Sequence, residues 1–180
     1  MSSVVARSNA GEARAGGGTA SSGAGKAPAG AGRARLTPSV HKFGGAALAN
    51  SSAICRTATL VELHVPAPCV IVVSAMAGVT DAFLALTAVS QRGSRGIVRP
   101  MAELRARHEA ALTDVSCDSE RRTALREVDQ QFEDLVRIVL SARRNPGMSP
   151  HDQARILSLG EKLSARIVVA HLRSRGINAE

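Results

Sequence analysis

Three short segments of the sequence combine glycine with charged or hydroxyl residues in ways that suit the binding of anions. The first is His41-Lys42-Phe43-Gly44-Gly45, in which a lysine near the end of an expected strand precedes two glycines. Glycine lets backbone N–H groups approach an anionic oxygen closely, and lysine adds a positive charge where negative charge develops in phosphoryl transfer. Taken alone the pattern is weak, because Gly-Gly after a strand is more often an ordinary turn, and it is neither a Walker loop nor G-x-G-x-x-G.

The second segment is Ser74-Ala75-Met76-Ala77-Gly78-Val79-Thr80-Asp81, between an expected strand and an expected helix. Open α/β sheets bind ligands at the carboxyl ends of their strands, and a helix N-terminus offers unpaired N–H groups to an anion. Ser74 and Thr80 add hydroxyl groups, and the small residues between them leave room. The alternative is structural: Thr80 caps the helix and Ser74 merely ends the strand.

The third segment, Leu157 to Arg166, places Gly160 and Glu161 inside an expected helix, beside an apolar stripe. A glycine in a helix interior costs about 1 kcal/mol relative to alanine, and such a cost often marks close approach by something else. Glu161 is therefore a candidate binding residue. On periodicity alone, a solvated glutamate paired with Lys162 or Arg166 is the more frequent case.

The elements that must position these segments alternate between strands and helices. A continuous apolar, β-branched run over 69–73 predicts a strand covered on both faces, as in a parallel sheet. Apolar residues at helical spacing predict a helical hairpin over 100–113 and 119–142, packed against the sheet. The full expectation is strands at 39–43, 69–73 and 177–180 and helices at 50–63, 80–91, 100–113, 119–142 and 149–176. This order indicates an α/β fold, an open and mostly parallel sheet flanked by helices on both faces.

Composition limits the classes of function. Residues 1–37 are rich in Gly, Ala and Ser, carry several Arg and offer little to bury, so we expect a disordered basic tail that precedes a domain at 38–180. Much of the net charge of +8 lies in that tail, and the rest is scattered, which argues against nucleic-acid binding. Cys55, Cys69 and Cys117 have no metal-ligand spacing, so we expect packing roles, a reducing cytoplasm and no metal ligands. No apolar run is long enough for a membrane helix.

Together the three segments resemble the aspartate kinase family, which has the amino-acid kinase fold. His41 to Leu48 is similar to the opening K-F-G-G-T-S motif of that family, Val72 to Asp81 to its second motif, and Leu157 to Ala165 to its third. The motifs occur in the family order, with a helical insert between the second and third. The resemblance covers residues 39–180 and extends to kinases fused to homoserine dehydrogenase.

The resemblance implies phosphoryl transfer from ATP, with Mg²⁺, to the side-chain carboxylate of L-aspartate, the first step towards lysine, threonine and methionine. Lys42 would stabilise the transferring phosphate, and Gly44, Gly45 and Gly78 would contact phosphate through the backbone. Ser74 and Thr80 would hold the aspartate, and Glu161 would pair with its ammonium group. The full-length protein would be a cytoplasmic homo-oligomer with no nucleic-acid or membrane partner.

Two departures from the family pattern modify this expectation. Ala46 and Ala47 stand where the family carries Thr and Ser, so two hydroxyls near the phosphate site are missing. The family domain also continues beyond a position like Glu180, so we expect an incomplete N-terminal portion, inactive or nearly so by itself. The alternative is a non-catalytic module that binds an amino acid or phosphate and pairs with a longer kinase subunit.

Overall fold

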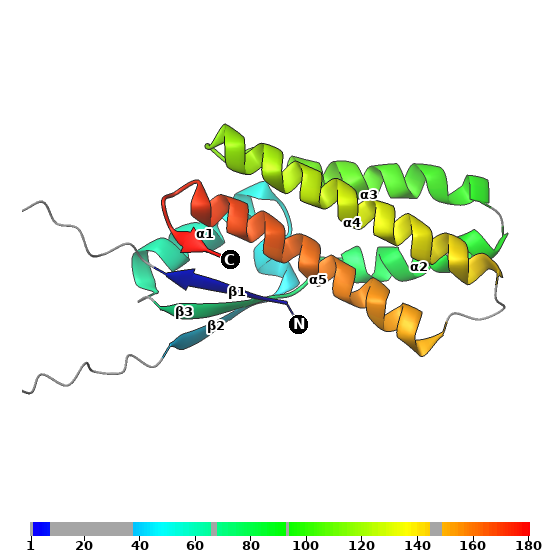
Figure 1. The fold of residues 1–180 in the computed structure, drawn as a ribbon, viewed down its shortest axis with the longest axis horizontal. Coiled ribbons are helices and arrows are strands. Elements are labelled where there is room, and N and C mark those ends of the chain that lie inside the picture. Colours follow the sequence, from blue (N-terminus) through cyan, green and yellow to red (C-terminus); the bar gives the residue numbers. More distant parts are fainter. Residues whose placement is uncertain (1, 8–37, 66–67, 93, 145–148) are drawn as a thin grey trace, which may run out of the picture.

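The computed structural model describes residues 2–7, 38–65, 68–92, 94–144 and 149–180. A small sheet lies at one end and a group of long helices extends away from it (Figure 1). The elements are β1 (Ser2–Arg7), β2 (Ser39–Phe43), a short 3-10 helix η1 (Gly45–Leu48), α1 (Ser51–His64), β3 (Cys69–Val73), α2 (Val79–Arg92), η2 (Ser94–Ile97), α3 (Val98–Ala110), α4 (Asp118–Arg144), α5 (Pro150–Arg173) and β4 (Asn178–Ala179). The predicted strands and helices are confirmed to within a few residues at each end.

The four strands are ordered β2-β3-β1-β4. β2 and β3 are parallel, with Lys42 opposite Val72 and Phe43 opposite Val73. β1 runs antiparallel to both of its neighbours, β3 and β4. β4 therefore points in the same direction as β2 and β3, and the antiparallel β1 between β3 and β4 makes the sheet a mixed one.

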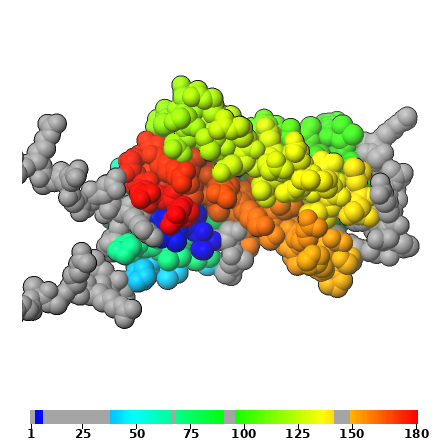
Figure 2. Space-filling model, viewed as in Figure 1, coloured from blue at the N-terminus to red at the C-terminus, as the bar shows by residue number. Residues whose placement is uncertain are grey.

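The expectation of a disordered tail over 1–37 is wrong for residues 2–7, which form β1. Val4 and Ala6 are buried, and Val5 exchanges two backbone hydrogen bonds with Glu180, of 2.8 and 2.9 Å between nitrogen and oxygen. In Figure 2 this strand (blue) lies beside the C-terminal residues (red). The average composition of the tail conceals Val4 and Val5, whose β-branched side chains suit a strand. Residue 1 and residues 8–37 lie outside the described residues.

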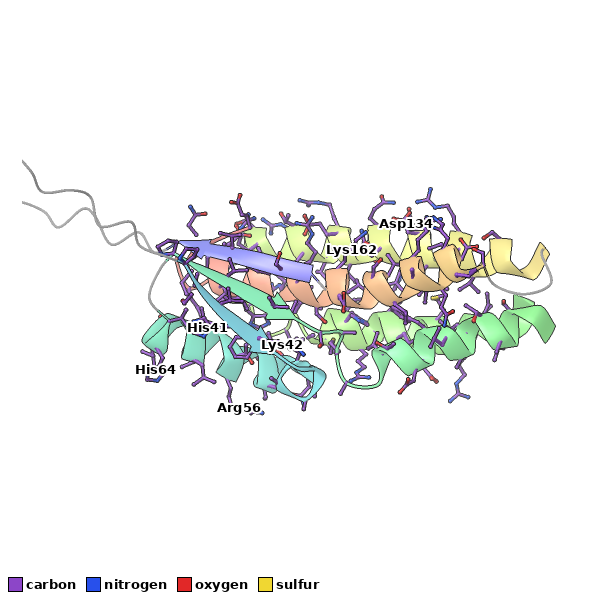
Figure 3. The ribbon with its side chains drawn as sticks, turned by 90° about the horizontal axis from the view of Figure 1, so that it is seen from below. His41, Lys42, Arg56, His64, Asp134 and Lys162 are labelled. Atoms are coloured by element: carbon purple, nitrogen blue, oxygen red, sulfur yellow. The ribbon has the colours of Figure 1, made fainter. Side chains whose placement is uncertain are left out.

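Burial alternates along β3, which differs from the predicted burial on both faces. Cys69, Ile71 and Val73 are buried, whereas Val70 and Val72 are half-buried. The described helices lie on the face that carries Ile71, and Figure 3 shows the opposite face of the sheet in front of them. A continuous apolar run cannot distinguish a strand covered on both faces from one whose second face is apolar but open.

The helical hairpin of α3 and α4 packs against other helices and not, as predicted, against the sheet. α4 lies along α5 and α2, away from the strands (Figure 1). Phe83 of α2, His108 of α3 and Phe132 of α4 form an aromatic cluster with ring centroids 5.3 to 6.3 Å apart. The amphipathic stripes therefore join the helices into a second layer, which extends beyond the sheet.

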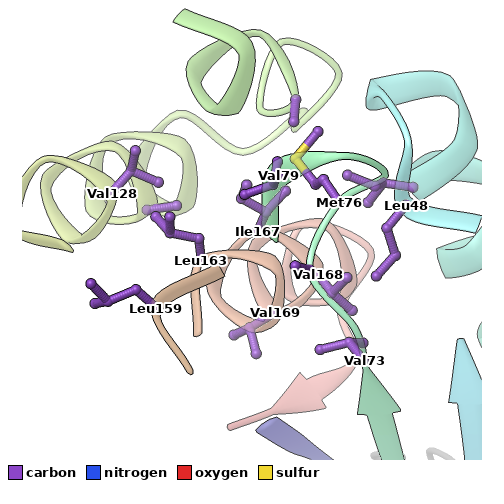
Figure 4. Close-up of a cluster of buried hydrophobic side chains, with 14 of the residues drawn as sticks. Leu48, Val73, Met76, Val79, Val128, Leu159, Leu163, Ile167, Val168 and Val169 are labelled. Carbon is purple, nitrogen blue, oxygen red and sulfur yellow. The ribbon is translucent and has the colours of Figure 1, made fainter. Parts of the chain in front are cut away.

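α5 is the central element of the core because it contacts both the sheet and the helical layer. Figure 4 shows Ile167 and Val168 of α5 surrounded by Leu48, Val73 and Met76. Burying an aliphatic side chain of this size contributes roughly 1.5–3 kcal/mol, so this helix holds the two halves of the molecule together. The Ser149 side chain caps α5 by accepting a 3.0 Å hydrogen bond from the Asp152 backbone N–H, as its sequence predicts.

No helix among the described residues is both long enough and apolar enough to span a membrane.

Because two histidines are buried, we predict that the folded chain loses stability in mild acid. Burial is the main cause that lowers the pKa of both His108 and His171 from the ordinary 6.5. The unfolded chain therefore binds more protons than the folded chain below about pH 6.5, and the free energy of unfolding falls as the pH decreases through that value. Urea unfolding at pH 7.5 and 5.5 measures the loss.

His108→Gln should reduce this loss, and His64→Gln, at an exposed position, is the matched control. Equal losses in the wild type and in His108→Gln would contradict a contribution from His108.

Candidate active site

The carboxyl end of β3 is where the three predicted motifs meet. Ser74 follows the strand directly, and its backbone N–H donates a 3.1 Å hydrogen bond to the carbonyl of Phe43, at the end of β2. The parallel register of β2 and β3 thus continues into the loop over 74–78. Lys42 of β2 and Ser74, directly after β3, accordingly lie at the same end of two neighbouring strands.

Gly45 packs directly on this loop. A Cβ atom added to Gly45 would lie 2.9 Å from the carbonyl oxygen of Ala75 and 3.3 Å from the backbone nitrogen of Ala77. Those neighbours are backbone atoms, which cannot move aside as a flexible side chain can. Gly44 differs, since a Cβ there meets nothing within 4 Å. The close approach of the first two motifs therefore depends on Gly45, whereas Gly44 leaves open space beside the turn.

Gly160 brings the third motif to the same loop from the other side. A Cβ atom on Gly160 would lie 2.9 Å from the Cβ of Ala75 and 3.5 Å from a methyl group of Val79. This contact explains the glycine inside α5, a residue that is otherwise unfavourable in a helix interior. Ala75 is thus enclosed between Gly45 and Gly160, and the motifs are joined through this one residue.

The loop ends at Gly78, where the helix α2 begins. Gly78 has a φ of +74°, which a residue with a side chain rarely adopts, and its carbonyl accepts a 3.1 Å hydrogen bond from Ala82. α2 begins at Val79, so Thr80 lies in the first turn and is not the cap residue that the structural alternative requires. Among the described residues, the hydroxyls of Ser74 and Thr80 make no hydrogen bond and could both donate to a ligand.

Arg107 of α3 holds two parts of the site together, and sequence reasoning missed it. Its Nη2 atom donates to the carbonyl of Ala77 at 2.7 Å and to the carbonyl of Ala49, after η1, at 3.2 Å. In the sequence Arg107 is one of several basic residues on a polar helix face. Because its partners lie 30 and 58 positions away, no local pattern identifies it.

Lys42 and Glu161 reach the site from opposite sides of the sheet. Successive residues of a strand point to opposite faces, so Lys42 lies on the open face together with Val40, opposite the face covered by α5. Figure 3 shows Lys42 near the carboxyl end of β2. Glu161 is half-buried on α5, next to Gly160. The structure therefore brings their backbone segments together at the loop, with one charged side chain on each side of it.

Two basic residues near Glu161, Arg166 and Lys162, have different surroundings. Arg166, one of the partners considered for Glu161, has Glu127 of α4 at 3.8 Å between Nε and Oε2. Lys162 is exposed on the surface of α5. Among the described residues, no group of three His, Cys, Asp or Glu side chains is placed to hold a metal ion. The site therefore combines a cation, two hydroxyls, a carboxylate and a glycine-lined loop.

The comparisons with known proteins agree with this arrangement. The family model described as the amino acid kinase family matches residues 38–180. The aspartokinase of Chlamydia muridarum is 30% identical over 143 residues, and that of Chlamydia pneumoniae is 31% identical over 137 residues. These matches cover 79% and 76% of this chain but 29% and 28% of the relatives, so the chain spans less than a third of their length.

The solved structures include E. coli aspartokinase III in complex with aspartate and ADP, in its R-state. It has a TM-score of 0.65 and 25% sequence identity, and the match covers 78% of this chain and 30% of that one. The T-state of the same enzyme, in complex with lysine and aspartate, matches equally well.

The two adjacent glycines of the first motif provide a matched pair of variants. We expect Gly45→Ala to lower the free energy of unfolding by about 1–3 kcal/mol, because the added methyl group meets the Ala75 carbonyl. Gly44→Ala has open space and an extended backbone, so its effect should stay within about 0.5 kcal/mol. Urea unfolding of both variants measures the difference. Equal effects would show that Gly45 is not required for the close approach.

Proposed function

Because the chain belongs to the amino acid kinase family, we propose that it carries the aspartate-binding and phosphate-contacting part of an aspartate kinase. The reaction is transfer of the γ-phosphoryl group of ATP to the side-chain carboxylate of L-aspartate. The observation that carries the proposal is the meeting of the three motifs at Ala75, between Gly45 and Gly160. Matches to aspartokinases, one of them in complex with aspartate and ADP, support it.

Phosphoryl transfer depends chiefly on positioning and on electrostatic stabilisation, which simple side chains can supply. Lys42, exposed at the end of β2, would neutralise charge on the transferring phosphoryl group. Gly44, Gly45 and Gly78 would let backbone N–H groups approach the phosphate oxygens. These residues occupy the edge of the sheet where parallel strands end, which is the usual ligand site of such folds.

The amino-acid substrate would be held on the side of the loop nearer α5. Ser74 and Thr80 have hydroxyls that could donate to the aspartate carboxylates, and the start of α2 adds unpaired backbone N–H groups. Glu161 would accept a charge-assisted hydrogen bond from the substrate ammonium group. The carboxylate to be phosphorylated would then lie at the loop, between these residues and Lys42.

The described residues suit the two expected cofactors, ATP and Mg²⁺, to different degrees. Lys42 and the glycine turn fit the phosphates of ATP. For Mg²⁺, no group of three His, Cys, Asp or Glu side chains is placed to hold the ion among the described residues. We further propose that the protein is a cytoplasmic homo-oligomer.

A second candidate function is a non-catalytic module that binds an amino acid. Ala46 and Ala47 favour it, because the 3-10 turn after Gly45 lacks the two hydroxyls that the resemblance places there. Both functions predict aspartate binding, and only the kinase predicts chemistry. Trapping with hydroxylamine, which converts an acyl phosphate to a hydroxamate, distinguishes them: aspartyl hydroxamate formed from ATP and aspartate supports the kinase and excludes the module. Because the chain by itself is expected to be inactive or nearly so, the absence of hydroxamate supports the module only when it is found for the full-length protein.

Aspartate binding tests the role of Glu161 directly. Calorimetric titration of the chain with L-aspartate and with succinate, which lacks the ammonium group, should show preferential binding of aspartate. A charge-assisted hydrogen bond contributes about 1.5–3 kcal/mol, so Glu161→Gln should weaken aspartate binding by roughly 10- to 100-fold and leave succinate binding nearly unchanged. Glu103→Gln, a substitution at an exposed glutamate of α3, is the matched control.

If the chain binds aspartate equally well with Gln at position 161, then Glu161 does not contact the substrate. If neither ligand binds at millimolar concentration, the proposed aspartate site is wrong.

A further inference from the structure

A thiol and an imidazole are paired between α1 and α5, apart from the candidate active site. The Sγ atom of Cys55, on α1, lies 3.7 Å from Nδ1 of His171, near the end of α5. His171 is buried, with 1% of its surface exposed, and Cys55 is half-buried. None of the three motifs includes either residue.

The second nitrogen of the ring determines which atom carries the proton. Nε2 of His171 lies 2.8 Å from the carbonyl oxygen of Ala111, after α3. A carbonyl can only accept a hydrogen bond, so Nε2 bears the hydrogen and, in the neutral ring, Nδ1 has the lone pair. Nδ1 therefore accepts the thiol hydrogen of Cys55. The thiol of Cys55, the imidazole of His171 and the carbonyl of Ala111 are thus linked by hydrogen bonds. They correspond to the nucleophile, the base and the group that orients the base in activated cysteines.

The backbone of Cys55 is also held in place. Its carbonyl accepts hydrogen bonds from Oγ1 of Thr59 at 3.0 Å and from Nη2 of Arg175 at 3.2 Å. Arg175 in turn pairs with Glu62 at 3.0 Å. These contacts join α1 to the end of α5, so the sulfur and the imidazole are held facing each other without a flexible link.

Burial keeps the ring of His171 neutral near pH 7, and the charged groups around it act in both directions. Burial is the largest cause and lowers the pKa of His171, and the cation of Arg175 lowers it further. The hydrogen bond to Ala111 and the carboxylate of Asp114 act in the opposite direction. A neutral imidazole is the form that can take a proton from a thiol.

We propose that Cys55 is a modification site that reacts with hydroperoxides, with His171 as its base. The thiol sulfur attacks the terminal oxygen of the hydroperoxide while the thiol proton passes to Nδ1. The O–O bond breaks, the alcohol or water leaves after taking up the proton, and Cys55 becomes a sulfenic acid. The sulfur is oxidised by two electrons and the hydroperoxide is reduced by two, so no further reactant is needed.

The other two cysteines serve as internal controls. Cys69 is buried in β3 and burial raises the pKa of its thiol, so it should react only if the chain unfolds. Cys117 is half-exposed and has no histidine partner among the described residues, and its hydrogen bond with Ser119 is the largest cause that lowers the pKa of its thiol. Its oxidation reports a thiol without an imidazole base.

The test is oxidation of the folded chain by hydrogen peroxide, with dimedone trapping and mass spectrometry of each cysteine. Cys55 should be oxidised about tenfold or more faster in the wild type than in His171→Gln, since a positioned general base contributes at least that much. The rate at Cys117 should be the same in both. His108→Gln, a change at the other buried histidine, should leave the rate at Cys55 unaltered.

The pH profile of the wild type provides a test that does not depend on a variant. Because the base is already neutral, the rate at Cys55 should vary by less than about threefold between pH 6.5 and 8, whereas an unassisted thiol gains nearly tenfold per pH unit below its pKa of about 8.5. The proposal is overturned if Cys55 follows the profile of an unassisted thiol, if it reacts no faster than Cys69, or if His171→Gln leaves its rate unchanged. If Cys69 is labelled in His171→Gln, that variant has unfolded and the wild-type profile decides.

Discussion

The close approach of three backbone segments at Ala75 is the constraint on which the site depends. Ala75 lies between Gly45 and Gly160, and a methyl group on either glycine would come within 2.9 Å of it. At that distance the neighbour must move, because real Cβ contacts are longer. The end of β3, the turn at Gly44 and Gly45 and the helix that carries Glu161 therefore have one relative placement. Ala75 and Gly160, which lie more than 80 residues apart in the sequence, are joined by this contact.

The rest of the fold supports this contact from two directions. α5 lies beneath the loop, and its buried Ile167 and Val168 pack on residues of β3 and η1 (Figure 4). Arg107 fixes the outer side of the loop through the carbonyls of Ala49 and Ala77. Aliphatic packing thus positions the loop against α5. The guanidinium of Arg107 fixes the distance between the loop and the turn after Gly45. The hydroxyls of the loop are left available for a ligand.

Much of this arrangement could be predicted from the sequence, because local patterns determine it. The β-branched run at 69–73 predicts its strand, and the Ser-Pro start predicts the beginning of α5. Gly160 is unfavourable within a helix, and that local cost correctly indicates a close neighbour. Features set by distant partners could not be predicted: the pairing of residues 2–7 with β3, the two hydrogen bonds of Arg107, and the placement of the helical hairpin against helices. The open face of the sheet was also missed, since apolar residues can occupy either a covered or an exposed face.

The measurement that tests the central claim most directly is an exchange of the methyl group between Ala75 and Gly160. Gly160→Ala alone should lower the free energy of unfolding, because overpacking of about 1–3 kcal/mol exceeds the roughly 1 kcal/mol gained in helix propensity. Adding Ala75→Gly removes the opposing methyl group, so the double variant should recover most of the stability and the affinity for aspartate. A double variant no better than the sum of the two single variants would contradict the account, since it would show that the two positions do not touch.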